Sequence, residues 1–150
     1  MLLREHFPEL AAWNVQILGT DLSDDVLEKA RSGRYTQMEV NRGLPAAMLI
    51  KHLHREGLAW ELNPSIRSLV SFHKMNLIEP WPALPLMDVV FLRNVLIYFS
   101  VPTKKAILEK IRKVMAPDAV LFLGAAETTL GIDDSFRPVR IDNTTFYRPS

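Results

Sequence analysis

Three side chains that can hold and orient a ligand follow the largely apolar run at residues 88–92. Arg93 and Asn94 come at once, and Tyr98 lies four residues after Asn94. The apolar run is typical of a strand that is covered on both faces. In open α/β sheets, ligands bind outside the carboxyl ends of the strands. The spacing therefore predicts a ligand site at the end of this strand.

Two further polar positions follow apolar runs in the same way. Asp21 comes after residues 14–20, and its carboxylate can accept hydrogen bonds from the hydroxyls of a ribose. Asn76 and Leu77 come after residues 66–72, and together they offer an amide and an apolar contact to an adenine ring. Each has a structural alternative. Asp21 can simply lead into the following helix, and Asn76 can belong to an ordinary strand-ending turn.

The residues after the 88–92 strand also have structural alternatives. Arg93 can form an ion pair with Glu127 or Asp88, and Tyr98 can be an ordinary core tyrosine. Their arrangement favours a site, because the carboxyl ends of parallel strands meet at one edge of a sheet. We therefore expect that edge to gather the polar residues that follow the strands, namely Asp21, Asn76, Arg93 and Asn94.

Strand and helix signals alternate along the chain, which indicates an α/β fold with a mostly parallel sheet. A helix end is expected at residues 1–12, and the irregular stretch 34–64 is the one candidate for a small inserted subdomain. The last two strands are expected to form a hairpin whose final strand is antiparallel. The expected strands are 14–20, 66–72, 88–92, 120–123, 137–141 and 144–148, and the expected helices are 24–32, 45–57 and 102–115.

Composition limits what the chain can be. Its 150 residues are 48% hydrophobic, which suits one domain spanning 1–150. A net charge of +1 argues against nucleic acid as a partner, and the absence of cysteine excludes disulfides and thiolate metal sites. No apolar run approaches the roughly 20 residues of a membrane-spanning helix. We expect a cytoplasmic protein with no direct membrane insertion.

A metal site is not expected either. His52 and His54, with Glu56, fall within the helix expected at 45–57. Side chains two residues apart on a helix point in different directions, so these groups cannot share a metal ion through one helix face. They are interpreted as solvated side chains.

Five sequence blocks resemble the CheR family of chemoreceptor glutamate methyltransferases, and the resemblance covers nearly the whole chain. The blocks are ILGTDLSDDVLEKARSGRY, RGLP, IRSLVSFHKMNL, DVVFLRNVLIYFS and LFLGAAET. The resemblance implies a Rossmann-like class I methyltransferase sheet. It also implies a protein-glutamate O-methyltransferase that uses S-adenosylmethionine, releases S-adenosylhomocysteine and acts on the cytoplasmic helices of chemoreceptors or on a related signalling protein.

The same resemblance implies roles for the candidate residues. Asp21 would hold the ribose, Asn76 and Leu77 the adenine region, and Arg93 with Asn94 the pocket around the cofactor. Tyr98 would be the catalytic residue, beside the transferring methyl group.

The chain departs from the family pattern at its start. Family members carry a helical receptor-binding domain, then a first strand and a glycine-containing loop, before the region that resembles this sequence. Without that first strand, two apolar strand edges lack partners, so we expect direct pairing of these edges, a strand-exchanged dimer or other homo-oligomer, or a fragment of a longer protein. The alternative function is an inactive remnant that binds S-adenosylmethionine, S-adenosylhomocysteine or a peptide in signalling.

Overall fold

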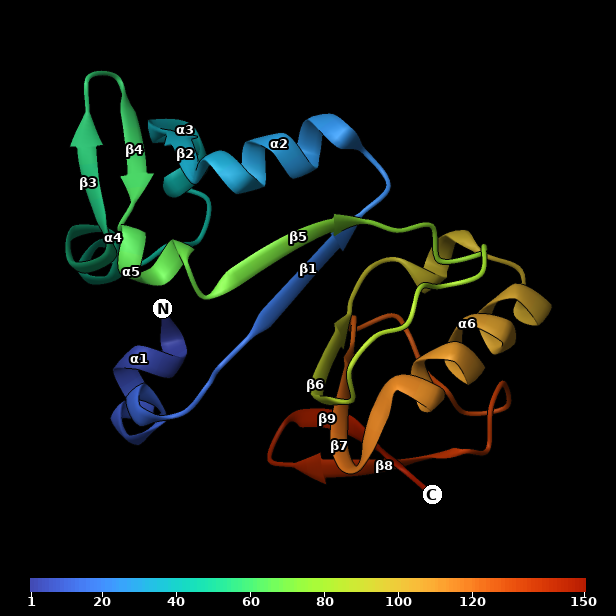
Figure 1. Cartoon of the computed structure of the whole chain (residues 1–150). Coiled ribbons are helices and arrows are strands. Elements are labelled where there is room, and N and C mark those ends of the chain that lie inside the picture. Colours follow the sequence, from blue (N-terminus) through green and yellow to red (C-terminus); the bar gives the residue numbers. More distant parts are fainter. The chain divides into compact units, whose positions relative to one another are not determined.

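The computed structural model describes all residues from 1 to 150, and the chain folds as two compact units (Figure 1). Unit 1 comprises Met1–Met75, and unit 2 comprises Asn76–Ser150. Each unit has its own strands and helices, and we describe each by itself.

Unit 1 contains a parallel pair of strands, β1 (Ile17–Asp21) and β5 (Val70–Lys74), which run side by side in Figure 1. Residue 21 is level with residue 74, so both carboxyl ends reach the same edge. The strand expected at 66–72 begins later than predicted, because Ile66 belongs to helix α5 (Pro64–Arg67). Proline is favoured in a first helical turn, where its missing N–H costs nothing.

Helix α2 (Asp24–Ser32) confirms the predicted helix at both ends. The Ser23 hydroxyl accepts a hydrogen bond from the Val26 N–H at 3.3 Å and so caps the first turn. Gly33 ends the helix in the left-handed conformation, with φ of 63°. Leu27 is the buried residue that holds the helix to unit 1. The local signals in this segment were sufficient to define it.

The segment 34–62 forms a three-stranded antiparallel sheet in the order β2-β4-β3. The helix expected at 45–57 is wrong in its second half, since it ends at His52 and the chain continues as a strand. Leu53 pairs with Leu62 across the sheet and is buried, so cross-strand pairing outweighs local helix propensity here. The elements are β2 (Arg34–Thr36), α3 (Gln37–Val40), α4 (Ala46–His52), β3 (Leu53–Glu56) and β4 (Ala59–Leu62).

The start of the chain is two short helices rather than one helix end. Helix α1 (Leu2–His6) stops at Phe7, whose φ of −135° is not helical, and a 3-10 helix, η1 (Pro8–Ala12), follows. Proline at the first position of η1 has no N–H to continue the ladder of α1. The helix expected at 1–12 is therefore interrupted at Phe7.

His52 is buried, with 5% of its surface exposed, and this corrects its interpretation as a solvated residue. Its Nε2 atom lies 2.8 Å from Glu5 Oε1, and Lys51 donates to Glu5 Oε2 at 2.9 Å. Glu5 thus joins helix α1 to helix α4 within unit 1. The hydrogen bond from Lys51, followed by the contact with His52, lowers the pKa of Glu5 against the opposing effect of burial.

We expect Glu5→Gln to destabilise the protein near neutral pH and to have little effect in acid. A carboxyl group with a lowered pKa contributes stability above its ordinary pKa of about 4.3, and this contribution is lost as the pH falls through the lowered value. Urea unfolding at pH 7 and at pH 3 measures the difference. Glu9→Gln, an exposed glutamate of η1 without an ion pair, is the control. An equal effect of E5Q at both pH values would contradict this assignment.

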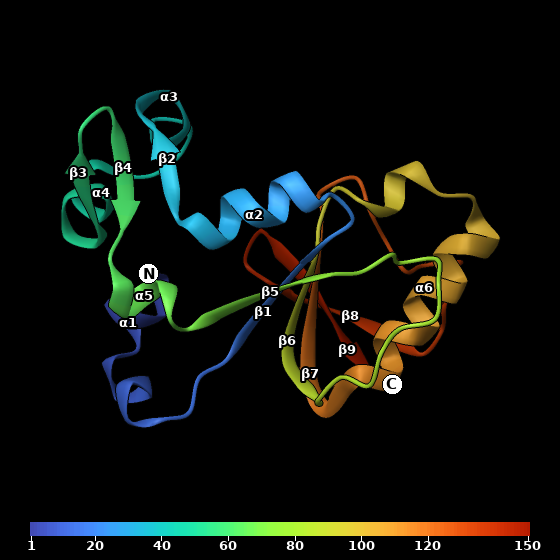
Figure 2. The ribbon, with the colours of Figure 1, turned by 45° about the horizontal axis from the view of Figure 1, so that its top comes forward.

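Unit 2 is built on a four-stranded sheet in the order β6-β7-β9-β8 (Figure 2). Strands β6 and β7 are parallel, and β9 joins β7 antiparallel through the pair Leu121 and Tyr147. The β8–β9 hairpin turns at Asp142, which has a φ of 50°, and it confirms the predicted antiparallel end of the sheet. The strands are β6 (Met87–Leu92), β7 (Met115–Leu123), β8 (Phe136–Ile141) and β9 (Thr144–Pro149).

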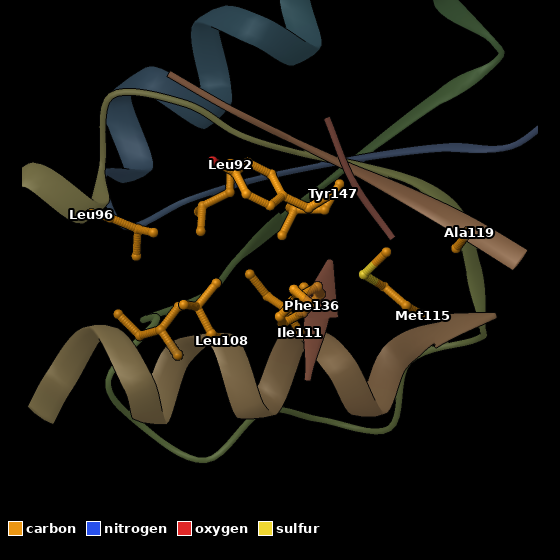
Figure 3. Close-up of a cluster of buried hydrophobic side chains, with 10 residues drawn as sticks. Leu92, Leu96, Leu108, Ile111, Met115, Ala119, Phe136 and Tyr147 are labelled. Carbon is orange, nitrogen blue, oxygen red and sulfur yellow. The ribbon is translucent and has the colours of Figure 1, made fainter. Parts of the chain in front are cut away.

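Helix α6 (Val101–Val114) confirms the amphipathic helix expected at 102–115, and it supplies the core of unit 2. Ile107 and Leu108 are fully buried, and Ile111 is 2% exposed. Their side chains meet those of the sheet in one hydrophobic cluster (Figure 3). This packing fixes the end of β6, because Leu92 and Leu96 belong to the same cluster.

Strand β6 is covered on one face only, which corrects the expectation of a strand buried on both faces. Val89 and Phe91 are 49% and 70% exposed, whereas Leu92 is 7% exposed. Phe91 stacks on Phe122 of β7 with ring centroids 5.0 Å apart, and its outer face remains open to solvent. Within unit 2, β7 is the one strand neighbour of β6, and within unit 1, β5 is the one strand neighbour of β1.

No helix of the structure combines the length and the apolar character that a bilayer crossing requires.

Candidate functional site

The loop after β6 carries three of the predicted site residues, and its backbone is bound by a single carboxylate. Glu127 Oε2 accepts from the N–H of Asn94 at 2.7 Å and from that of Gly124 at 2.6 Å. Its Oε1 accepts from the N–H groups of Val95 and Leu96 at 2.8 and 2.7 Å, and the Ile97 N–H lies 3.4 Å away. These residues lead into a 3-10 helix, η2 (Leu96–Tyr98), so the carboxylate fills the free amides at the start of that helix.

Asn94 and Gly124 are in close contact around this carboxylate. Asn94 has a φ of 60°, a conformation in which asparagine is more common than most other residues. A side chain on Gly124 would place its Cβ 2.6 Å from Glu127 Oε2 and 2.9 Å from the Asn94 nitrogen. Glycine is therefore required at the end of β7 for the carboxylate to reach the loop.

Electrostatics agree with an ionised Glu127. Burial by itself would raise the pKa of this half-buried carboxyl, but the backbone N–H groups of Asn94, Gly124, Val95 and Leu96 outweigh it and lower the pKa. A carboxylate that accepts several backbone hydrogen bonds is stabilised in its charged form. The group is therefore negatively charged at neutral pH.

Arg93 and Tyr98 both face solvent on this loop. Arg93 is exposed and forms an ion pair with neither Glu127 nor Asp88, so the ion-pair alternative is wrong. Tyr98 is 79% exposed, which excludes the core-tyrosine alternative. Its hydroxyl has no hydrogen-bond partner within the chain. Both side chains are thus free to contact a ligand.

Asn76 and Leu77 lie in the segment of unit 2 that precedes β6, where Asn76 forms a turn. The Asn76 amide donates to Glu79 Oε1 at 3.0 Å, and its carbonyl oxygen accepts from the Ile78 N–H at 3.2 Å. Leu77 is half-buried against the core cluster. Lys110 of α6 donates to the Leu77 carbonyl at 2.5 Å and so holds the segment to the helix. In this structure the Asn76 side chain therefore belongs to an ordinary strand-ending turn.

Asp21 ends β1 in unit 1, where its side chain forms the turn that leads into α2. Its Oδ1 accepts from the Ser23 N–H at 2.8 Å, in the turn that leads into α2. Its carbonyl accepts from the Met75 N–H at 3.0 Å, so the ends of β1 and β5 are joined there as expected. The side chain is exposed, and its second oxygen has no partner in the chain. One carboxylate oxygen therefore remains available to a ligand.

The structure brings Arg93, Asn94 and Tyr98 together on one loop of unit 2, whereas Asp21 lies in unit 1. The sequence prediction missed the roles of Glu127, Gly124 and Lys110. A signal for the first two exists, since LFLGAAET places a carboxylate three residues after a glycine that ends a strand. The sequence offers Glu127 as a partner for the Arg93 side chain, whereas its actual partners are backbone N–H groups.

Each unit has a pair of parallel strands followed by polar side chains, and in α/β proteins the carboxyl ends of parallel strands are where ligands bind. Comparison with known proteins narrows the class. Residues 1–145 match the family described as CheR methyltransferase, SAM binding domain. The chain belongs to this family, and its fold is therefore of the Rossmann-like methyltransferase type.

Several curated relatives cover most of this chain. Chemotaxis protein methyltransferase 1 of Pseudomonas aeruginosa is 38% identical over 135 residues, which is 89% of this chain and 49% of the relative. Chemotaxis protein methyltransferase Cher2 of Pseudomonas putida is also 38% identical, over 89% and 49% of the two chains. A chemotaxis protein methyltransferase of Borreliella burgdorferi is 32% identical, over 87% and 47%. The chain spans about half the length of these relatives.

The family's name indicates S-adenosylmethionine (SAM) as the cofactor. The residues present fit this molecule in part. Asp21 has a free carboxylate oxygen that suits ribose hydroxyls, and Arg93 is a free cation that suits a carboxylate. The Asn76 side chain, by contrast, has both its amide and its carbonyl committed to its own turn.

Proposed function

We propose that this chain carries part of a SAM-dependent methyltransferase that esterifies glutamate side chains on the cytoplasmic helices of chemoreceptors. The observation that supports it most directly is the loop of Arg93, Asn94 and Tyr98, which presents two unpaired polar side chains at the end of β6 in a member of the CheR family. The family gives the cofactor, and the exposed loop gives a place where a ligand can be held.

When bound, SAM supplies a methyl group on a positively charged sulfur. The acceptor glutamate is already ionised at neutral pH, since its ordinary pKa is about 4.3, so no residue of the chain has to remove a proton. One oxygen of the acceptor carboxylate would form a bond to the methyl carbon as the carbon–sulfur bond breaks, which would leave S-adenosylhomocysteine and a methyl ester. The task of the chain is to position two reactants and to exclude water.

Each candidate residue has a definite part in this proposal. Asp21 accepts hydrogen bonds from the ribose hydroxyls, and Arg93 attracts a carboxylate of the bound cofactor. Asn94 lines the pocket beside Arg93, and Leu77 offers apolar contact next to the adenine. The Tyr98 hydroxyl donates a hydrogen bond to the acceptor carboxylate and holds that carboxylate in line with the methyl group. Asn76 must exchange at least one of its turn hydrogen bonds to contact the adenine.

Two measurements on the 150-residue chain test the proposal. Calorimetric titration with S-adenosylhomocysteine measures binding, and transfer of a labelled methyl group from SAM to a chemoreceptor cytoplasmic fragment measures activity. Binding together with transfer supports the proposal. Binding without transfer favours the alternative of a cofactor-binding module, and the absence of both contradicts the two functions together.

We expect Tyr98→Phe to lower methyl transfer by about 10²-fold, because the loss of one orienting contact misplaces the acceptor. Binding of S-adenosylhomocysteine and the unfolding midpoint should change little, since the hydroxyl is exposed and unpartnered. Steady-state kinetics and urea unfolding give the three quantities. Tyr147→Phe is the matched control, because its buried hydroxyl contacts Thr128 and its loss should affect stability. Unchanged transfer in Y98F would contradict the role of Tyr98.

A further inference from the structure

We propose that Glu127 is a positioning residue, which acts through the backbone of the loop after β6 to set where Arg93 and Tyr98 point. Its effect on methyl transfer rests on the proposed function, whereas its effect on the loop does not. Glu127 is not one of the groups that would contact a ligand, because both of its oxygens are taken up by N–H groups of the chain.

The hydrogen bonds of Glu127 join two neighbouring strand ends. Oε2 links the N–H of Asn94, just after β6, to the N–H of Gly124, just after β7. Oε1 binds the Val95 and Leu96 amides at the start of η2. A single rigid carboxylate therefore fixes the distance between the two strand ends and the direction in which the chain leaves β6.

The loop needs this external support because its own conformation is unfavourable. Asn94 adopts a positive φ, and the first amides of a 3-10 helix have no partners within the helix. The Glu127 carboxylate satisfies those amides, so they are not open to a phosphate or carboxylate of a ligand. The groups that the loop offers outward are therefore side chains, and the first of them is Arg93.

Anchoring at Leu96 turns the fixed backbone into fixed side-chain positions. Leu96 is 1% exposed and packs in the core cluster together with residues of α6 (Figure 3). Arg93 lies on one side of the Glu127-bound amides, and Tyr98 lies two residues beyond Leu96. With the backbone held by Glu127 and the Leu96 side chain held by the core, the backbone positions from which the Arg93 and Tyr98 side chains project are fixed.

Glu127→Gln is the sharpest variant, because it keeps the size of the side chain and replaces one accepting oxygen with a donating amide. Whichever way the amide turns, one pair of backbone N–H groups then faces a donor. Glu127→Asp keeps the charge but shortens the reach by one methylene. Glu109→Gln, an exposed glutamate of α6 without an ion pair, is the control for the charge change.

A double-mutant cycle separates positioning from a general loss of structure. In the full chain, E127Q should lower methyl transfer to the chemoreceptor fragment at least tenfold, and Y98F should have a much smaller effect in the E127Q background than in the wild type. The control E109Q should transfer at the wild-type rate. Independent, multiplicative effects of E127Q and Y98F, or wild-type transfer by E127Q, would overturn the role. If E127Q does not fold, the same cycle is carried out with E127D.

A spectroscopic measurement keeps this inference apart from the proposed function. In proton–nitrogen NMR spectra of the full chain, the amides of Asn94, Val95 and Gly124 should shift together as acid protonates Glu127, with one midpoint below the ordinary range of a glutamate. This shared pH-dependent shift should be absent in E127Q, and its midpoint should change in E127D. If the wild type neither binds S-adenosylhomocysteine nor transfers methyl groups, the proposed function fails while this titration still reports on the loop. Amides that titrate independently would overturn the inference itself.

Discussion

Leu108→Ala is expected to reduce the free energy of unfolding by about 2–5 kcal/mol, the range for a buried leucine whose removal leaves a cavity. Leu108 is fully buried on α6, where it packs in one cluster with residues of β6 and β7 (Figure 3). The same cluster contains Leu92 and Leu96, which flank the start of the site loop. A loss of this size is a large fraction of the 5–15 kcal/mol that typically stabilises a domain.

Urea unfolding followed by circular dichroism measures the effect. Leu86→Ala is the matched control, because Leu86 is 63% exposed just before β6 and its truncation should cost less than about 0.5 kcal/mol. A change below 1 kcal/mol in L108A would mean that α6 does not pack on the sheet as the structure has it. Binding of S-adenosylhomocysteine should weaken in L108A only under conditions where part of the protein is unfolded.

The second large effect is expected at Asp21, where alanine should weaken S-adenosylhomocysteine binding by about 10- to 100-fold. A hydrogen bond to a charged acceptor contributes about 1.5–3 kcal/mol, and each 1.4 kcal/mol is a factor of ten in affinity. The carboxylate is exposed, ends β1 and has one oxygen without a partner in the chain. These properties suit an acceptor for two adjacent hydroxyl groups.

Asp21→Asn separates ligand binding from the turn. Asparagine keeps an oxygen that can accept from the Ser23 N–H, so the lead into α2 is preserved, while the charge and the second acceptor are lost. We expect D21N to bind nearly as weakly as D21A but to match the wild type in stability. Asp25→Asn, an exposed acid in the first turn of α2, is the control for charge. Wild-type affinity in D21N would show that Asp21 is a turn residue alone.

Elements with strong local signals were predicted well from the sequence. Helix α2 has a capping serine, two acids in its first turn and a terminal glycine, and both of its ends fall where these residues place them. Helix α6 has a continuous apolar stripe, and the β8–β9 hairpin has alternating strands around Asp142 and Asn143. In each case the determining contacts are a few residues apart, so they are visible in a short window of sequence.

Elements that depend on distant partners were predicted poorly. The second half of the helix expected at 45–57 becomes β3 because Leu53 pairs with Leu62. Residue 66 falls in a helix and β5 begins at Val70, where the chain meets β1. The exposed face of β6 depends on which elements cover it, and an apolar run gives no information on that point.

The sequence by itself determined the family and the polar residues that follow the strands, because motif residues and their spacing are properties of the chain. Asp21, Arg93 and Tyr98 were candidates on that basis, and each is exposed in the structure. Only the tertiary structure decided that Glu127 binds the backbone of the site loop and that Asn76 is committed to a turn. Glu127 and Asn94 are 33 residues apart, and their contact exists because β6 and β7 lie side by side in the folded sheet.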